Sequence, residues 1–178
     1  MRKLSLSELN RMSIDEYKDA EKTPIIVILD NIRSLNNIGS VFRTADAFRL
    51  EAIFLCGISG TPPNKEIHKT ALGATESVSW KYFEKTSDAI IEARKLNYLV
   101  YAVEQADESI SIHEFIPGKN KKISLVFGNE INGVDTTVMD QIDGCIEIPQ
   151  YGTKHSLNIA VSVGIAIWEI FKKLKESF

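Results

Sequence analysis

Three polar turns of this chain, each placed directly after an apolar run, carry the side chains best suited to chemistry. Together they offer an arginine, a carboxylate, a hydroxyl and two amides, from Asn37, Arg43, Glu130, Ser156 and Asn158. In α/β proteins such turns lie at the carboxyl ends of parallel strands, where ligands bind. A guanidinium can hold a phosphate through two parallel hydrogen bonds, and amide and hydroxyl groups can shape a pocket around a ligand. The three turns therefore favour one binding site.

The first turn predicts a phosphate site at the start of a helix. We expect a helix over residues 38–50 with Asn36 or Asn37 as its N-cap, and Gly39 would keep its mouth open to a bulky group. Arg43 lies roughly 9 Å further along the axis, at about 1.5 Å per residue. Its side chain leans back toward the N-terminus, where free amides and the helix dipole also favour an anion. The alternative is a capped helix whose arginine forms a surface ion pair.

The other two turns also have ordinary structural interpretations. A carboxylate such as Glu130 suits the dipole at a helix N-terminus. Ser156 can be a simple helix cap, and Asn158 can satisfy backbone groups in a buried turn. The three histidines show no spacing that suggests a metal site or a triad, and only His155 lies within one of the turns.

Composition indicates one globular domain without a metal or a membrane span. The chain has 178 residues, 44% of them hydrophobic, which is enough for one substantial core. No run approaches the roughly 18 apolar residues of a membrane span, and residues 1–10 lack the apolar core of a signal peptide. Cys56 and Cys145 lie far apart in apolar runs, which favours buried free thiols over a metal site or a disulfide. We therefore expect a cytoplasmic protein.

The charge balance argues against a protein that binds nucleic acid through bulk charge alone. The net charge is −3, from 21 basic and 24 acidic residues. A local basic surface around an active site is compatible with this balance. It could be formed by Arg33, Arg43, Arg49, Lys65, Lys69 and Lys154.

Strand and helix signals alternate from residue 24 onward. Before that point, Ser-x-x-Glu boxes starting at Ser5 and Ser13 predict two short helical turns. Apolar runs predict strands over residues 25–29, 52–56, 77–82, 98–103, 123–127 and 145–148. Helices are predicted over residues 38–50, 64–73, 87–97, shortly after 133, and 156–175. Apolar strands bounded by helices imply a parallel sheet that is covered on both faces.

The last predicted helix suggests a homodimer. Its residues 157–171 leave almost no polar face. A helix that is apolar all round must be buried on all sides. In so small a domain the sheet covers one side, and we expect a second subunit to cover the other.

The three turns, in this order and at these separations, resemble the motifs of the SpoU (TrmH-type) RNA ribose 2′-O-methyltransferases of the SPOUT class. Asn-x-Gly-x-x-x-Arg-Thr-Ala matches residues 37–45, Phe-Gly-Asn-Glu-x-x-Gly matches 127–133, and Ile-Pro-x-x-Gly-x-x-x-Ser-Leu-Asn matches 148–158. Gln150, where the family usually has Met, is a mild departure. Many relatives carry an RNA-binding domain ahead of the core. In this chain only about two dozen residues precede the core. We divide the chain into a short helical extension, residues 1–23, and a methyltransferase domain, residues 24–178.

The resemblance implies an α/β SPOUT fold, a parallel sheet with helices on both faces and a C-terminal deep trefoil knot. It implies S-adenosylmethionine as the cofactor, tRNA or rRNA as the substrate, and a homodimer. Gly128, Ile148 and Leu157 would hold the adenosine, and Val103 would close the pocket.

The implied reaction is methylation of a ribose 2′-hydroxyl, with Arg43 at its centre. A guanidinium is a poor proton acceptor, so we expect Arg43 to draw an RNA phosphate into place and to stabilise developing negative charge. Glu130 would orient Arg43 or the nucleotide. Asn37, Ser156 and Asn158 would shape the pocket by hydrogen bonding.

Three other functions match parts of this pattern. A non-catalytic RNA-binding protein on the same scaffold would not need this set of polar side chains. A dinucleotide-dependent oxidoreductase is disfavoured because the first turn lacks Gly-x-Gly-x-x-Gly. A small-molecule methyltransferase stays open, although an arginine at a helix mouth favours a phosphate-bearing substrate.

Overall fold

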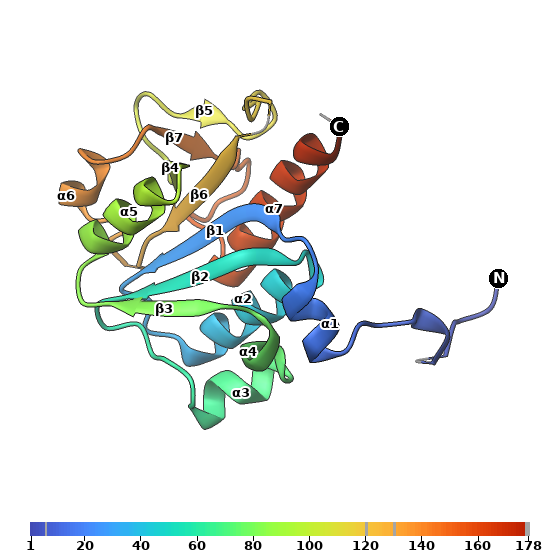
Figure 1. Ribbon diagram of the computed structural model, residues 1–178. Helices are drawn as coiled ribbons and strands as arrows, with labels where there is room; N and C mark the ends of the chain where they lie inside the picture. Colours follow the sequence, from blue (N-terminus) through green and yellow to red (C-terminus); the bar gives the residue numbers. More distant parts are fainter. Residues whose placement is uncertain (6, 120, 130, 177–178) are drawn as a thin grey trace.

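The computed structural model describes residues 1–5, 7–119, 121–129 and 131–176 (Figure 1). These residues form one seven-stranded sheet in the order β3-β2-β1-β6-β4-β7-β5, and every pair of neighbouring strands is parallel. The strands are β1 Thr23–Asp30, β2 Leu50–Cys56, β3 Trp80–Phe83, β4 Tyr98–Val103, β5 Ile110–Ser111, β6 Lys122–Phe127 and β7 Gly144–Glu147. The predicted parallel sheet is confirmed, and the two-residue strand β5 is an addition to it.

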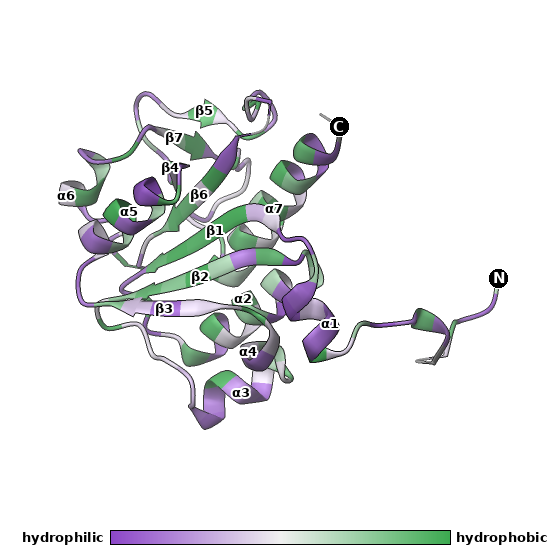
Figure 2. Ribbon diagram, viewed as in Figure 1, coloured by the Kyte–Doolittle hydropathy of each residue, from purple (hydrophilic) through white to green (hydrophobic). Residues whose placement is uncertain are grey.

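Helices cover both faces of the sheet, as predicted. One hydrophobic core lies between the sheet and α1, α2, α3 and α7, and a second lies between the opposite face and α5 and α6. Figure 2 shows hydrophobic residues concentrated along β1, β2, β6 and α7. The helices are η1 Ser7–Leu9, α1 Ile14–Asp19, α2 Leu35–Ala47, α3 Lys65–Ala71, α4 Ala74–Ser77, α5 Thr86–Lys95, α6 Thr136–Met139 and α7 Ile159–Glu176.

The central strand β1 explains why its sequence is an unbroken apolar run. Residues 25–29 are fully buried, because β2 and β6 flank the strand and helices cover both of its faces. A strand buried on both faces has no solvent side and therefore no alternation of polar residues.

The strand order determines where a site can form. β6 lies between β1 and β4, and β4 in turn pairs with β7. The carboxyl ends of β4, β6 and β7 therefore meet at one edge of the sheet, although the three strands lie far apart in sequence. The deep trefoil knot stays a prediction from the family resemblance.

The start of α2 differs from the prediction. The helix begins at Leu35 with Ser34 as its N-cap, and the amide of Asn37 donates to Ser34 Oγ at 3.3 Å. Asn37 is thus inside the first turn and does not cap the helix. Packing explains the earlier start, because Leu35 lies against the loop after β2. A Cβ atom built on Gly60 of that loop would be only 2.3 Å from Leu35 Cδ2.

Gly39 also serves a different purpose from the one predicted. It lies in the second turn of α2 and is buried against α3. An added Cβ would be 2.1 Å from Thr70 Oγ1 and 2.3 Å from the carbonyl oxygen of Ile67. The glycine therefore allows two helices to approach closely, and it does not keep a helix mouth open.

The start of α7 also differs from the prediction. The helix begins at Ile159 and not at Ser156, and Asn158 caps it. Asn158 Oδ1 accepts a hydrogen bond from the amide of Ala160 at 2.9 Å. Ser156 consequently belongs to the preceding loop, and the interpretation of Ser156 as a helix cap was wrong.

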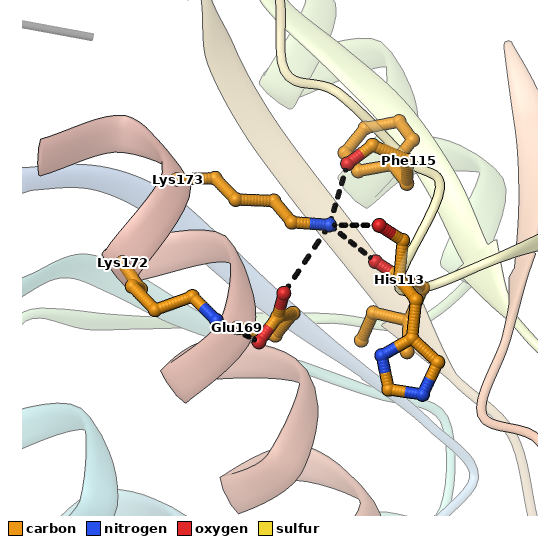
Figure 3. A network of polar contacts seen from close by, with 6 residues as sticks. His113, Phe115, Glu169, Lys172 and Lys173 are labelled. Carbon is orange, nitrogen blue, oxygen red and sulfur yellow. Dashed lines mark hydrogen bonds and ion pairs between the residues drawn. The ribbon is translucent and has the colours of Figure 1, made fainter. Parts of the chain in front are cut away.

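A lysine near the end of α7 anchors the segment after β5 (Figure 3). Lys173 Nζ donates to the carbonyl oxygens of Ile112 at 2.6 Å, His113 at 2.9 Å and Phe115 at 2.9 Å. It also lies 3.3 Å from Glu169 Oε1, and the other oxygen of Glu169 accepts from Lys172 Nζ at 2.8 Å. The end of the last helix is therefore tied to the edge of the sheet.

The N-terminal extension holds the two predicted helical turns, η1 and α1. Ser13 and Glu16 form a complete capping box at the start of α1. In Figure 1 the chain before α1 points away from the sheet. In the described part of the chain, no helix combines the length and hydropathy needed to cross a membrane.

Candidate functional site

A cavity of about 750 Å³ lies at the carboxyl ends of β4, β6 and β7. Val103 is the last residue of β4, Gly128 follows β6, Ile148 follows β7, and Leu157 lies in the loop before α7. All four residues, which were proposed to hold a cofactor, line this one cavity. Its volume lies within the roughly 300–1,000 Å³ of small-molecule sites.

The loop after β6 forms one wall of the cavity, and Gly128 and Gly133 allow its tight conformation. The amide of Asn129 donates to the carbonyl oxygen of Gly133 at 2.9 Å, and the amide of Gly133 donates back to Asn129 at 2.8 Å. A Cβ atom on Gly128 would lie 2.1 Å from the amide nitrogen of Val134, so a side chain at that position would force this tight loop open. Gly133 has a φ of +67°, in the left-handed region that favours glycine.

The last residue of β1 and the residue after it hold the same loop in place. Asn129 Nδ2 donates to the carbonyl oxygen of Asn31 at 2.8 Å. The carboxylate of Asp30, at the end of β1, is buried and accepts from the amide of Asp135 at 3.2 Å and from the hydroxyl of Thr86 at 2.5 Å. The loop is therefore fixed at both of its ends before any ligand binds.

The first and third turns meet at the opposite wall. Asn158 Nδ2 donates to Asn37 Oδ1 at 3.2 Å, across 121 residues of sequence. Asn158 and Ser156 line the cavity, and Asn37 lies just outside it. The helices diverge little from this point, because the Phe48 ring at the end of α2 lies 5.2 Å from Phe171 of α7. The contact between the two asparagines thus starts a side-by-side packing of α2 and α7.

Arg43 lies outside this cavity. It is exposed on α2 and lines a second cavity, of about 710 Å³, together with Arg11, Arg49 and Asp46. Asp46 accepts from the hydroxyl of Ser77 at 2.5 Å. The structure consequently brings Asn37, Ser156 and Asn158 together and leaves Arg43 further along α2. The predicted site residue Glu130 lies outside the described residues, in the loop whose two ends, Gly128 and Gly133, line the first cavity.

Glu104 and Gln105 are among the lining residues that were not predicted from the sequence. Glu104 Oε2 accepts from the amide of Val134 at 3.2 Å, and Gln105 Nε2 donates to the carbonyl oxygen of His155 at 3.0 Å. Each therefore connects the end of β4 to another wall of the site. A polar pair directly after the apolar strand 98–103 was the available signal, since the end of a parallel strand is where ligands bind.

The cysteines do not contribute a nucleophile. Both are buried free thiols, as predicted. Burial raises the pKa of Cys56 to about 12 and also raises the pKa of Cys145, so both stay protonated near neutral pH. No group of three His, Cys, Asp or Glu side chains among the described residues is arranged to hold a metal ion.

The cavity combines apolar walls with polar backbone. Ile148, Leu157 and Met139 supply flat apolar surface, and the turns after β6 and β7 supply amide and carbonyl groups. Such a lining suits a planar heterocycle with a polar chain attached to it.

Comparison with known proteins identifies the family. Residues 24–168 match the SpoU rRNA Methylase family. The chain is 27% identical over 155 residues to the 23S rRNA (guanosine-2′-O-)-methyltransferase RlmB of Neisseria meningitidis serogroup B. That match includes 87% of this chain and 61% of the relative, so the chain spans about three fifths of the length of that protein.

Solved structures agree with this assignment. The TrmH/SpoU tRNA modifying enzyme of A. aeolicus superposes with a TM-score of 0.80 at 25% identity, over 92% of this chain and 81% of that one. An AdoMet-bound rRNA methyltransferase from Sinorhizobium meliloti superposes with a TM-score of 0.79 at 29% identity, over 89% of this chain and 60% of that one. With its motifs, its sheet and its cavity all in agreement, this chain belongs to the SpoU rRNA methylase family.

Proposed function

We propose that this protein transfers a methyl group from S-adenosylmethionine to a ribose 2′-hydroxyl in tRNA or rRNA. The observation that carries the proposal is the convergence of the family motifs on one cavity, where Asn158 contacts Asn37 across 121 residues and Gly128 forms part of the facing wall. The named relatives act on 23S rRNA and on tRNA, which supports an RNA substrate.

The described lining fits the cofactor. S-adenosylmethionine supplies a methyl group that is already activated by its positively charged sulfur. Ile148 and Leu157 offer apolar surface for the adenine, and Val103, at the end of β4, closes the pocket. Gly128 allows the loop after β6 to come close to the cofactor. An AdoMet-bound relative with the same fold supports this assignment.

The protein's own polar groups position the RNA. Positioning of a nucleophile can lower a barrier by roughly 7–11 kcal/mol. In our proposal Asn37, Ser156 and Asn158 shape the edge of the cavity where the ribose enters. Arg43, about 9 Å along α2 from Asn37, grips a phosphate of the RNA outside the cavity. Glu130 orients the nucleotide or Arg43.

A homodimer completes the proposal. The inner side of α7 is buried in the core, but Leu157, Val161, Ile165 and Trp168 are 38%, 50%, 39% and 54% exposed. Val161, Ile165 and Trp168, spaced by four and three residues, lie along one side of α7, and Leu157 lies in the loop just before the helix. An exposed apolar stripe of this kind marks an interaction surface. A second copy of the chain is its proposed occupant, and a cytoplasmic location suits an enzyme that acts on tRNA or rRNA.

The test combines cofactor binding with mapping of the product. We expect calorimetry to show one S-adenosylmethionine site per chain, and total RNA from cells that lack the protein to lose one defined 2′-O-methyl group. A chain that binds RNA but shows no affinity for S-adenosylmethionine would instead be a non-catalytic RNA-binding protein on the same scaffold.

A further inference from the structure

Glu104, the residue directly after β4, is held more firmly than an ordinary loop carboxylate. Its amide donates to the carbonyl oxygen of Ile146 at 3.1 Å, which extends the pairing of β4 with β7 by one residue. Its carbonyl oxygen accepts from the thiol of Cys145 at 3.4 Å. The backbone of Glu104 is therefore part of the rigid sheet.

The carboxylate of Glu104 is held in place as well. Oε2 accepts from the amide of Val134 at 3.2 Å, and Oε1 accepts from the amide of Gln105 at 3.0 Å. A Cβ atom on Gly133 would be 2.4 Å from Oε2, so the carboxylate lies directly against the loop after β6. A carboxylate can accept about four hydrogen bonds, and these two amides leave it capacity for more.

No lysine or arginine balances the charge of Glu104 within the described lining of the cavity. Among the lining residues that the structure describes, Glu104 is the only one with a carboxylate, and none is a lysine or an arginine. No ion pair of Glu104 occurs among the described residues. A half-buried, unpaired negative charge makes the cavity attractive to a cationic ligand.

We propose that Glu104 is a cofactor-specificity residue, which makes the cavity prefer the cationic methyl donor to its neutral product. The inference rests on the proposed function. S-adenosylmethionine has a net charge of about +1 near neutral pH, because its sulfonium adds to a balanced amino acid group. Transfer of the methyl group to the ribose oxygen leaves a neutral thioether and releases the hydroxyl proton. The attraction to Glu104 is lost in the same step, which favours exchange of product for fresh donor.

The test measures two dissociation constants for each protein, with S-adenosylmethionine and with S-adenosylhomocysteine, by calorimetry. For Glu104→Gln we expect the constant for S-adenosylmethionine to rise about tenfold, as unit charges several ångströms apart near a protein surface imply. The constant for S-adenosylhomocysteine should change less than about twofold. Sinefungin carries a protonated amine in place of the methylated sulfonium. Its dissociation constant should rise as that of S-adenosylmethionine does.

The matched control is Glu108→Gln, which removes an exposed carboxylate from the same loop without touching the cavity. It should change neither constant. If Glu104 only supported the loop after β6, Glu104→Gln would weaken binding of the three ligands equally, and this result would overturn the inference.

The wild-type protein gives a second measurement that does not depend on the folding of a variant. Added salt should weaken binding of the cationic donor more than binding of the neutral product, and equal weakening would also overturn the inference. Failure of the wild-type protein to bind any of the three ligands would overturn the proposed function itself.

Discussion

At the scale of single residues, some of the site residues line the cofactor cavity and others, such as Arg43, do not. Asn158 and Ser156 line the cavity, whereas Arg43 lies on the exposed side of α2 in a second cavity. A residue that grips RNA and a residue that holds the cofactor should therefore respond differently to substitution.

Arg43→Ala should reduce methylation at least tenfold, a loss of about 1.4 kcal/mol or more of transition-state stabilisation. The dissociation constant for S-adenosylmethionine should stay within about twofold of the wild-type value, because Arg43 does not line that cavity. Single-turnover methylation and calorimetry measure the two quantities. Arg43→Lys should also reduce methylation, because an ammonium group lacks the planar, two-pronged donor geometry with which a guanidinium holds a phosphate.

The control for Arg43 is Arg94→Ala, which removes another exposed arginine, on the opposite face of the sheet. Arg94 pairs with Asp143 at 3.3 Å, and a surface pair of this kind contributes little to stability. Arg43→Ala with more than about a tenth of wild-type turnover would contradict the role assigned to Arg43.

The two cysteines should be protected from alkylation in the folded protein. Burial raises the pKa of Cys56 to about 12 and raises that of Cys145, so at about pH 8 both are neutral thiols, and the thiolate is the reactive form. We expect iodoacetamide to label neither in native buffer and both in guanidinium chloride, as measured by mass spectrometry. Rapid native labelling of Cys56 would show that β2 opens easily.

At the scale of elements, the packing of α2 determines where the first motif lies. Gly39 brings α2 against α3, and Asn37 brings its first turn against the N-cap of α7. The first motif therefore combines a packing residue with residues of the site.

Gly39→Ala should destabilise the fold by about 1–3 kcal/mol. The added Cβ would lie 2.3 Å from the backbone carbonyl oxygen of Ile67, which cannot rotate away. Thermal and urea unfolding would measure the loss. Gly164→Ala is the matched control, because it also places alanine within a helix but has no neighbouring atom within 4 Å. Without such a clash, alanine should stabilise α7 by roughly 0.5–1 kcal/mol.

Lys173→Met should destabilise the fold by about 1–3 kcal/mol, because three carbonyl oxygens lose their charged donor (Figure 3). Lys172→Met, one residue earlier, removes a pair with Glu169 that is more exposed and should cost less than about 1 kcal/mol. Urea unfolding compares the two variants. Equal losses would indicate that Lys173 does not anchor the segment after β5.

At the scale of the whole molecule, the two sides of α7 differ in burial. One side is completely buried against the sheet at Val163, Ala166, Ile167 and Ile170. The other side carries the exposed residues Val161, Ile165 and Trp168. Leu157, in the loop just before α7, continues this stripe and also lines the cofactor cavity. The proposed subunit interface is therefore continuous with the site.

Trp168→Glu should convert the proposed dimer to a monomer at micromolar concentration. The substitution places a charge without a partner within the proposed apolar contact. Sedimentation velocity measures the association. Ile116→Glu, at an apolar side chain that is 82% exposed and lies outside the stripe, should leave the dimer intact. A wild-type protein that sediments as a monomer would contradict the interface.

The sequence alone was enough to predict a parallel sheet, helices on both of its faces, and most of the polar residues of the site. Each apolar run and each turn is a local pattern, and a parallel strand buried on both faces, such as β1, must read as an unbroken apolar run. The motif residues were also visible, because their types and spacing do not depend on what packs against them. Glu104 and Gln105 were missed because their place after a strand was the available signal, and other polar residues of the chain share that place.

Only the tertiary structure decided which strands are neighbours, and through them which residues share a cavity. Leu35 packs against the loop at Gly60, so α2 begins three residues before its predicted start, with Ser34 as its N-cap, and Asn37 contacts Asn158. The insertion of β6 between β1 and β4 places the loop at Gly133 against Glu104. Contacts between residues so distant in sequence depend on how complete elements pack, and that information is absent from any short stretch of the chain.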